Sequence, residues 1–169
     1  TDSKLTALVT AGPTHEYIDP VRYITNRSSG KQGYEIAKCL QECGVQTTLI
    51  TGPTNLSPAE GIKTIEVKSA EDMFKRTLEK LPSDIGIFSA AVSDWRIKNY
   101  KNTKIKKDDD INLKFERNTD ILNHVSNHNS LRPKIVIGFS AETNDIIKNS
   151  KIKIEQKNCD WLIANNVSD

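Results

Sequence analysis

The segment best suited to bind a phosphate is residues 11–33, with the sequence AGPTHEYIDPVRYITNRSSGKQG. Gly12 begins a Gly-Pro turn, and Ser28, Ser29 and Gly30 directly precede an expected helix start. Backbone N–H groups and the helix dipole at such a start attract anions. The dinucleotide pattern GxGxxG is not met, because seventeen residues separate Gly12 from Gly30, and the P-loop pattern fails because Lys31 is not followed by Ser or Thr.

Two polar side chains within this segment, Arg22 and Asn26, stand four residues apart. A guanidinium and an amide at that spacing could bind one carboxylate or phosphate together. Judged by residue type alone, the two side chains could equally well be exposed to solvent without a ligand. Structureless connections longer than about 12–15 residues are uncommon in compact domains and are usually functional or disordered. We therefore expect a long polar loop from Thr14 to about Lys31 that carries a binding site.

Residues 90–110, AAVSDWRIKNYKNTKIKKDDD, join a small-residue turn to a basic run. Ala90 leaves room for a ligand at the backbone, and Asp94 suits a ribose hydroxyl or a metal ion. Five lysines follow, namely Lys98, Lys101, Lys104, Lys106 and Lys107. We predict that residues 94–115 form a protruding basic flap that could close over a triphosphate. The alternative is a solvated charge run balanced by Asp108 to Asp110, and RNA binding fits poorly because the run is short and acid-flanked.

The last third of the chain offers weaker signals. Phe139 ends an expected strand and could stack on a base, although a core position suits the pattern at least as well. Lys153 and Lys157 share a helix face, which usually means exposure to solvent. His124 and His128 have the spacing of two metal ligands, but no third ligand accompanies them, so surface histidines are the favoured interpretation.

The strands and helices that must position these residues are indicated by alternating apolar and amphipathic runs. The alternation predicts a Rossmann-like α/β fold with a doubly wound, mainly parallel sheet. Expected strands are 5–9, 45–50, 64–67, 84–93, 134–139 and 161–164. Expected helices are 33–43 with a stop at Gly44, 69–81 with Ser69 as N-cap, a short one from Asp120, and 142–157. Ligands bind beyond the carboxyl ends of such strands, so the loops after residues 10, 51, 89 and 139 should share one rim.

Composition narrows the class of protein. The 169 residues carry 24 Lys plus Arg against 22 Asp plus Glu, a net charge of +2, which argues against a nucleic-acid or membrane-surface binder. The longest uncharged apolar run, 85–92, is too short to span a bilayer, and the first ten residues lack signal-peptide features. Of three cysteines, Cys39 and Cys43 are predicted to be core thiols. We expect one cytoplasmic domain.

Taken together, these segments resemble phosphopantothenate–cysteine ligase, also called phosphopantothenoylcysteine synthetase, of the bacterial CTP-dependent type. The resemblance covers essentially the whole chain. It rests on GPTHEYIDPVRYITNRSSGKQG, AAVSDWRIKNYKNTKIKK, NTDIL at 118–122, GFSAET at 138–143 and the closing ANNVS, in the family's order.

The resemblance implies a two-step ligation in coenzyme A biosynthesis. The carboxylate of 4′-phosphopantothenate attacks the α-phosphate of CTP, which releases pyrophosphate and leaves an acyl-cytidylate. The amine of cysteine then displaces CMP and gives phosphopantothenoylcysteine. It also implies Mg²⁺ at the phosphates, a homodimer whose flap reaches toward the partner subunit, and association with or fusion to a flavin-dependent decarboxylase. No nucleic-acid or membrane partner is expected.

Position by position, the resemblance assigns three catalytic residues. Asn26 would contact the acyl carboxylate and the intermediate, Arg22 would be its companion, and Lys104 would assist formation of the acyl-cytidylate. The residues assigned to the nucleotide are Gly12, Ser28, Ser29, Gly30, Phe88, Ser89, Ala90, Asp94, Lys104, Thr119, Asp120, Ile121, Leu122, Phe139, Lys153 and Lys157. No residue is assigned as a metal ligand.

The chain departs from the family pattern in places. Thr119 stands where proline is common, the 94–97 string lacks its usual proline, and Gln32 replaces a common methionine. Family ligase domains usually continue past the ANNVS stretch, so we expect 1–169 to be a single ligase domain without that extension, either stand-alone or an excised half. Two alternatives remain, an NAD(P)-dependent Rossmann reductase and a non-catalytic nucleotide-binding module.

Overall fold

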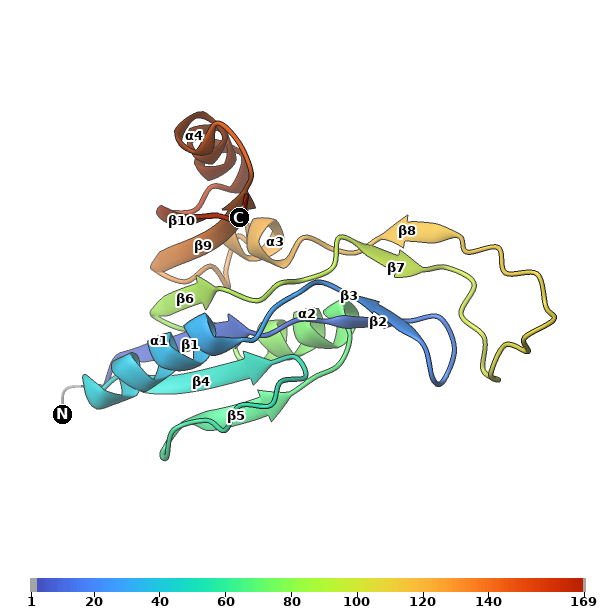
Figure 1. Cartoon of the computed structure of the whole chain (residues 1–169). Coiled ribbons are helices and arrows are strands. Elements are labelled where there is room, and N and C mark those ends of the chain that lie inside the picture. The colour runs from blue at the N-terminus through green and yellow to red at the C-terminus, as the bar shows by residue number, and fades with distance from the viewer. Residues whose placement is uncertain (1–2, 169) are drawn as a thin grey trace.

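Six parallel strands form the central sheet of the computed structural model, which describes residues 3–168 (Figure 1). Their order across the sheet is β10-β9-β6-β1-β4-β5, and each neighbouring pair runs parallel. The strands are β1 (Thr6–Ala11), β4 (Gln46–Thr51), β5 (Lys63–Glu66), β6 (Ile85–Phe88), β9 (Ile135–Glu142) and β10 (Trp161–Asn166).

The strand order reverses at the centre of the sheet. From β1 the chain adds β4 and β5 on one side, and then crosses back to add β6, β9 and β10 on the other. This is the doubly wound order of a Rossmann-like fold, so the predicted fold class is confirmed. The reversal between β1 and β6 is the point where ligands of such folds bind.

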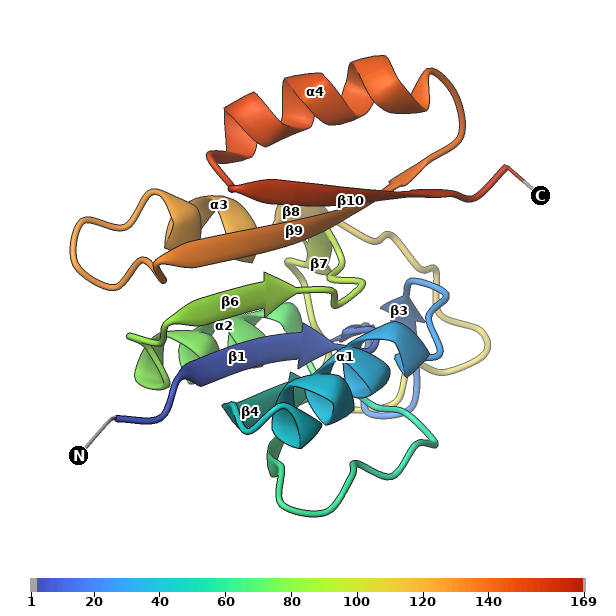
Figure 2. The ribbon, with the colours of Figure 1, turned by 90° about the vertical axis from the view of Figure 1, so that its left-hand side faces the viewer.

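Helices cover both faces of the sheet at its central strands, which explains the long apolar runs there. Successive residues of a strand point to opposite faces. Leu8, Ile50 and Phe88 therefore pack in one cluster with residues of α2 (Ala70–Glu79), α3 (Ile121–Ser126) and α4 (Ile146–Lys157). Their neighbours in sequence pack against α1 (Lys31–Glu42) on the other face. Figure 2 shows α4 along the β9–β10 edge, away from α1.

Local sequence signals set where the helices begin and end. The Ser69 side chain accepts a hydrogen bond of 3.1 Å from the Asp72 N–H, and Asp120 accepts one of 3.0 Å from the Asn123 N–H. Gly44, at a φ of 82°, takes the left-handed conformation that stops α1. The predicted N-cap at Ser69, the helix start at Asp120 and the helix stop at Gly44 are confirmed. No helix among residues 3–168 is both long enough and apolar enough to cross a bilayer.

Two short antiparallel ribbons extend from the carboxyl-end side of the sheet (Figure 1). One pairs β7 (Trp95–Ile97) with β8 (Phe115–Arg117), as expected for a protruding ribbon at 94–115. The other pairs β2 (His15–Tyr17) with β3 (Tyr23–Thr25), within the segment predicted as a polar loop. The loop prediction was wrong for residues 15–25. The hairpin could not be recognised because strands of three residues are too short to show the alternation of apolar and polar residues.

The prediction of core thiols at Cys39 and Cys43 is also wrong, since both side chains are exposed. The buried positions of α1 are Gly33 and Ala37. Cys39 follows Ala37 by two residues and so lies on nearly the opposite side of the helix. Cys43 is the C-cap, beyond the last helical turn.

Gly33 holds α1 against the strand ends, and we expect Gly33→Ala to be destabilising. A Cβ there would lie 2.4 Å from the Ala11 Cβ and 2.6 Å from the Ser89 Oγ. Helix propensity alone favours alanine over glycine by about 1 kcal/mol, but overpacking costs about 1–3 kcal/mol. Urea denaturation should therefore give a lower midpoint for Gly33→Ala, whereas Glu35→Ala, on an exposed turn of α1, should not. A raised midpoint for Gly33→Ala would contradict the close contact.

Candidate functional site

The candidate site begins where β1 and β6 end. Past β6, the Ser89 N–H donates to the Thr10 carbonyl at 3.2 Å, and the Ala91 N–H donates to the Gly12 carbonyl at 2.9 Å. The Ser89 hydroxyl also donates to the Thr10 carbonyl at 2.6 Å. The two loops thus continue side by side beyond the sheet, and they bring Gly12 to Ser89 and Ala90 as predicted.

The turn at residues 28–30 lies on this strand end. Gly30 is the N-cap of α1 at a φ of 77°, and a Cβ on it would lie 3.2 Å from the Gly12 Cα. The Ser28 Oγ accepts from the Gly30 N–H at 3.2 Å, and the Ser29 Oγ accepts from the Lys31 N–H at 3.3 Å. The start of α1 therefore presents a Ser-Ser-Gly turn to the reversal point, in the place expected of an anion site.

The loop after β4 closes the third side of this rim. A Cβ on Gly52 would lie 1.6 Å from the Pro13 carbonyl oxygen, so the two backbones are in direct contact. The Thr54 methyl packs over Gly12 and Gly30, 2.9 Å and 2.8 Å from the positions their Cβ atoms would take. The loops after β1, β4 and β6 consequently meet on one rim, as the strand pattern predicts.

Asn26 is held across this rim. Its side-chain Nδ2 donates to the Val92 carbonyl at 3.2 Å, which ties the first loop to the segment after β6. A cavity of about 510 Å³ opens beside it. The cavity is lined by Pro13, His15, Tyr23, Thr25, Asn26, Arg27, Ser28, Ser29, Pro53, Thr54, Asn55 and Leu56. Within it the His15 ring stacks on Tyr23 at 3.9 Å, and burial lowers the pKa of His15, so that the imidazole is neutral at pH 7.

Arg22 does not accompany Asn26. The two residues flank β3, whose extended backbone separates their Cα atoms by about 13 Å. Arg22 lies at the hairpin tip, where its guanidinium pairs with Asp19 and donates to the Ile105 carbonyl at 3.3 Å. The structure therefore does not bring the two side chains together within one chain, because the segment between them is a strand.

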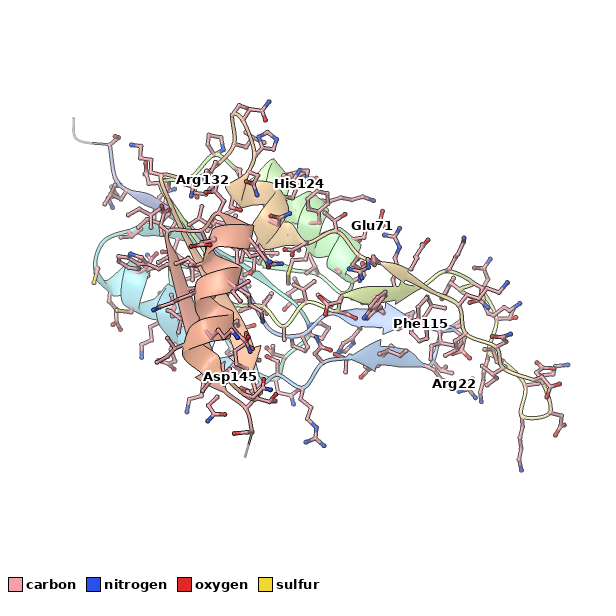
Figure 3. All side chains as sticks on the ribbon, turned by 90° about the horizontal axis from the view of Figure 1, so that it is seen from above. Arg22, Glu71, Phe115, His124, Arg132 and Asp145 are labelled. Atoms are coloured by element: carbon pink, nitrogen blue, oxygen red, sulfur yellow. The ribbon has the colours of Figure 1, made fainter. Side chains whose placement is uncertain are left out.

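Lys104 lies with Arg22 rather than with the rim. The flap encloses a cavity of about 590 Å³, and Lys101, Lys104 and Lys114 contribute to its lining. The Lys98 N–H donates to the Lys114 carbonyl at 2.8 Å, which continues the ribbon past β7 and β8. Figure 3 shows the ribbons, marked by Arg22 and Phe115, far from Asp145 at the start of α4. Asp94 is exposed at the base of the flap.

Both predicted nucleotide-binding lysines of α4 form ion pairs. Lys157 pairs with Asp120, the N-cap of α3, and Lys153 pairs with Glu142 at the end of β9. Lysines at this spacing on a helix usually face solvent, but here each of the two contacts a carboxylate of the same chain. Asp120 and Lys157, predicted for the same ligand, are in direct contact.

Several predicted nucleotide contacts have their side chains in the core. Phe88 is 7% exposed and Ile121 is 4% exposed, so they can offer only main-chain atoms to a ligand. Leu122 packs half-buried against the α2–α3 core, and Phe139 against the α1 core. Thr119 is exposed beside Asp120. Because the Phe139 ring packs partly against the core, only its exposed part could stack on a base.

Two buried acids at the site were missed. Glu16 accepts from the Ala70 N–H at 2.9 Å, and Asp19 accepts from the Val21 and Arg22 N–H groups at 2.9 Å each. Desolvation raises the pKa of Glu16 against the lowering effect of its hydrogen bonds. The Asp19-Pro20 sequence was the available signal for a turn, because an aspartate before a proline commonly caps one.

The described residues contain no group of three or more His, Cys, Asp or Glu side chains placed to hold a metal. The rings of His124 and His128 lie 5.8 Å apart edge to face. The His128 Nδ1 accepts from the N–H groups of Ser130 and Leu131 at 3.2 Å and 3.0 Å, so that nitrogen is already occupied.

Known proteins resemble this chain over nearly its whole length. Residues 3–169 match the family model described as DNA/pantothenate metabolism flavoprotein C-terminal domain. The "Coenzyme A biosynthesis bifunctional protein CoaBC" of Haemophilus influenzae is 43% identical over 166 residues, which is 97% of this chain and 41% of that protein. The protein of the same name from Escherichia coli is 38% identical over 169 residues, 97% of this chain and 41% of its length. This chain thus spans about two fifths of these relatives.

Solved structures share the fold. The crystal structure of the C-terminal domain of a CoaBC protein superposes with a TM-score of 0.84 at 36% identity, covering 96% of this chain and 77% of that one. A mutant of Cab2 in complex with phosphopantothenate-cysteine gives a TM-score of 0.76, covering 96% of this chain and 73% of that one. At 16% identity this second likeness concerns the fold alone.

The environment of Glu16 predicts that Glu16→Gln is stabilising at neutral pH. Burial raises the carboxyl pKa, so the folded state binds the proton more tightly, and stability rises as pH falls through that pKa. An amide avoids the charge, and its oxygen can still accept from the Ala70 N–H. We expect a gain of about 0.5–1.5 kcal/mol at pH 7 that shrinks in acid.

Urea denaturation between pH 3 and pH 7 measures this difference. Glu35→Gln, at an exposed position of α1, is the control and should change the midpoint by little at either pH. A loss of stability at pH 7 in Glu16→Gln would show that the ionised carboxylate is required by the fold.

Proposed function

This chain belongs to the DNA/pantothenate metabolism flavoprotein C-terminal domain family, and we propose that it is a phosphopantothenate–cysteine ligase of coenzyme A biosynthesis. The family relatives are named as bifunctional coenzyme A biosynthesis proteins, and a protein of the same fold binds phosphopantothenate-cysteine. The observation that carries the proposal is the rim at the β1–β6 reversal, where the Gly12 and Ser28–Gly30 turns meet Ser89 and Ala90 beside Asn26.

The first step we propose is activation of the substrate acid. The carboxylate of 4′-phosphopantothenate attacks the α-phosphorus of CTP, a P–O bond breaks, and pyrophosphate leaves with the bonding electron pair. The Gly12 main chain and the Ser28 and Ser29 hydroxyls, which can donate while they accept from the Gly30 and Lys31 N–H groups, would hold the phosphates. Lys104 would neutralise the charge that develops on the leaving group. Positioning and charge neutralisation suffice here, since the nucleophile is ionised at neutral pH.

The second step consumes the acyl-cytidylate. The amine of cysteine attacks the acyl carbon, an amide bond forms, the C–O bond to CMP breaks, and the amine proton is lost to solvent. Asn26 keeps one N–H on Val92, and an amide has a second N–H. We assign that second donor to the carboxylate oxygen in the first step and to the developing oxyanion in the second.

A divalent cation suits this rim. Mg²⁺ commonly binds through one or two carboxylates together with substrate phosphates, and Asp94, directly before β7, offers an exposed carboxylate at the base of the flap. Asp94 is therefore the residue that would hold the ion, and a bound Mg²⁺ would supply charge neutralisation at the phosphates.

The remaining nucleotide contacts would come from the α3–α4 side. Thr119 and Asp120 precede α3, and Lys153 and Lys157 face carboxylates from α4. CTP binding at these residues requires the lysines to exchange a carboxylate for a ligand group. Ile121, Leu122 and Phe88 would contribute main-chain atoms or packing, as their burial dictates.

A second copy of the chain would complete the site. Arg22 and Lys104 lie on the ribbons, which extend beyond the sheet (Figure 1), while Asn26 and the phosphate turn stay on the rim. The separation along β3 supports a homodimer in which the ribbons of one protomer reach the rim of the other. We further propose a cytoplasmic protein that works with, or is joined to, a phosphopantothenoylcysteine decarboxylase, because the named relatives are bifunctional.

The proposal predicts pyrophosphate release that depends on CTP and 4′-phosphopantothenate and does not need cysteine. A coupled pyrophosphate assay with the purified protein and Mg²⁺ measures it, with ATP in a parallel arm to test the choice of nucleotide. Adding cysteine should convert the burst into steady turnover. No release from a folded dimer with either nucleotide would rule out the ligase, and hydride transfer from NADPH would revive the reductase.

Replacing Lys104 should slow mainly the first step, whereas replacing Asn26 should slow mainly the second step, in which the oxyanion develops. Lys104→Gln should slow the pyrophosphate burst by about 10²-fold, because a cation at the leaving group is lost. Asn26→Asp should slow transfer to cysteine by about 10²-fold, because a donor to the oxyanion is lost. Rapid-quench measurement of the acyl-cytidylate separates the two effects. Lys107→Gln, also on the exposed flap, is the matched control and should keep near-normal rates.

Mixing the two inactive variants tests whether the flap acts across the dimer. Random exchange of protomers makes half of the dimers mixed, and each mixed dimer then holds one site without a defect. Activity should rise to about a quarter of the wild-type rate. No recovery in a mixture shown to exchange protomers would place Lys104 in the same protomer's site.

A further inference from the structure

We propose that Asp19 is a positioning residue whose buried carboxylate fastens the tip of the β2–β3 hairpin to the flap, and so holds Arg22 and the backbone beside Lys104 as one unit. We call this set of contacts, made by Asp19, Arg22 and Ile105, the hairpin–flap clasp. Its role in catalysis rests on the proposed ligase function, whereas its geometry does not.

The carboxylate of Asp19 receives hydrogen bonds from both segments. Its Oδ1 accepts from the N–H groups of Val21 and Arg22, each at 2.9 Å. Its Oδ2 accepts from the Ile105 N–H at 3.0 Å and pairs with the Arg22 guanidinium. The side chain of Asp19 is 0% exposed. A fully buried carboxylate needs such partners, since an unpaired buried charge is strongly unfavourable.

These contacts exceed what a turn requires. An aspartate that caps a turn needs only the local N–H groups two and three residues on. The bond to Ile105 joins residues 86 apart, and Arg22 closes the ring by donating to the Ile105 carbonyl at 3.3 Å. The Lys101 N–H adds a second link, at 3.1 Å to the Ile18 carbonyl. The hairpin therefore docks on the flap of its own chain.

The clasp keeps its charge under all working conditions. Desolvation raises the pKa of Asp19, but the hydrogen bonds from Ile105, Val21 and Arg22 outweigh it and lower the pKa to about 2. The carboxylate therefore stays ionised at neutral pH and keeps accepting from all its donors. Loss of the clasp by protonation would begin only in strong acid, as pH falls toward that value.

The clasp also orients the guanidinium. Both of its contacts to Arg22 use the Nη1 nitrogen. An arginine binds a carboxylate or phosphate through two adjacent N–H donors, and the clasp does not use the edge made by Nε and Nη2. The side chain is 41% exposed, so that edge can meet a substrate anion. Because Lys104 precedes Ile105, one carboxylate sets the position of two proposed catalytic residues.

Hydrogen exchange tests the geometry without any activity. In Asp19→Asn an amide nitrogen can replace Oδ2, which removes the acceptor for Ile105. The Ile105 amide should then exchange at least about tenfold faster, while core amides such as Val9 keep their protection. Asp108→Asn, an exposed flap position with the same change of charge, is the control and should leave Ile105 unchanged. Unchanged exchange at Ile105 in Asp19→Asn overturns the clasp.

Kinetics test the positioning role. Asp19→Asn should slow the pyrophosphate burst about tenfold or more and raise the KM for 4′-phosphopantothenate, with the KM for CTP within about twofold. A structural defect alone would change both KM values and lower thermal stability together. Normal burst kinetics in a variant whose Ile105 amide has lost protection would show that the clasp positions nothing.

A second variant covers the case in which Asp19→Asn fails to fold. Ile105→Pro deletes the N–H donor and leaves the carboxylate intact. In the folded Ile105→Pro protein the pyrophosphate burst should be about tenfold slower or more, because the hydrogen bond that joins the flap to the hairpin is lost. A normal burst in that folded variant would overturn the proposal. If wild-type protein released no pyrophosphate, the ligase proposal would fail, and the exchange of Ile105 would still decide the clasp.

Discussion

Backbone contact at the carboxyl ends of β1, β4 and β6 is the constraint on which the rest of this structure depends. Gly52 lies directly against the Pro13 carbonyl, Gly33 lies against Ala11, and Gly30 lies against Gly12. Any side chain at these positions would drive the loops apart. The proposed phosphate site is therefore built on closely packed main chain, and this packing limits how far α1 can begin from the sheet. Small residues at the rim reflect this geometry, and charged groups must enter from elsewhere.

Charge enters from outside the rim, and the charges that matter here are paired. Asp19 is held by Arg22 and Ile105, and Lys157 and Lys153 are held by Asp120 and Glu142. A net charge of +2 conceals these local arrangements. Each ion pair restricts the conformations of its charged side chains before any ligand binds. In the proposed ligase a nucleotide would have to compete with Glu142 and Asp120 for Lys153 and Lys157, although the lysines it meets are already held in place.

The sequence was a good guide to elements whose signals are local. Long apolar strands and the Ser69, Asp120 and Gly44 boundaries could be predicted, because periodicity and capping depend on neighbouring residues. The doubly wound, mainly parallel sheet followed from the alternation of runs. The rim could be predicted as well, since strand ends of a parallel sheet share one edge.

What failed depends on residues far apart in the chain. The β2–β3 hairpin has strands of three residues, and its stability comes from partners such as Ile105 and Ala70. Missing that hairpin led to the wrong pairing of Arg22 with Asn26. The exposed cysteines of α1 show the same limit, because the apolar face of a helix with mixed residues can be drawn in more than one way. Ion pairs between α3 and α4 left no sequence signal.

The 86-residue span of the clasp also fixes when the site can exist during synthesis. Thr6 pairs with Gln46, so β1 and β4 can join early, but Ala7 finds its β6 partner only at Ile85. Closing long loops is entropically costly and slows folding. A chain elongating from its N-terminus can therefore build half of the sheet before β6 exists, and it can seat Arg22 only after Ile105 has emerged. The hairpin is therefore synthesised well before the flap segment that orders its tip.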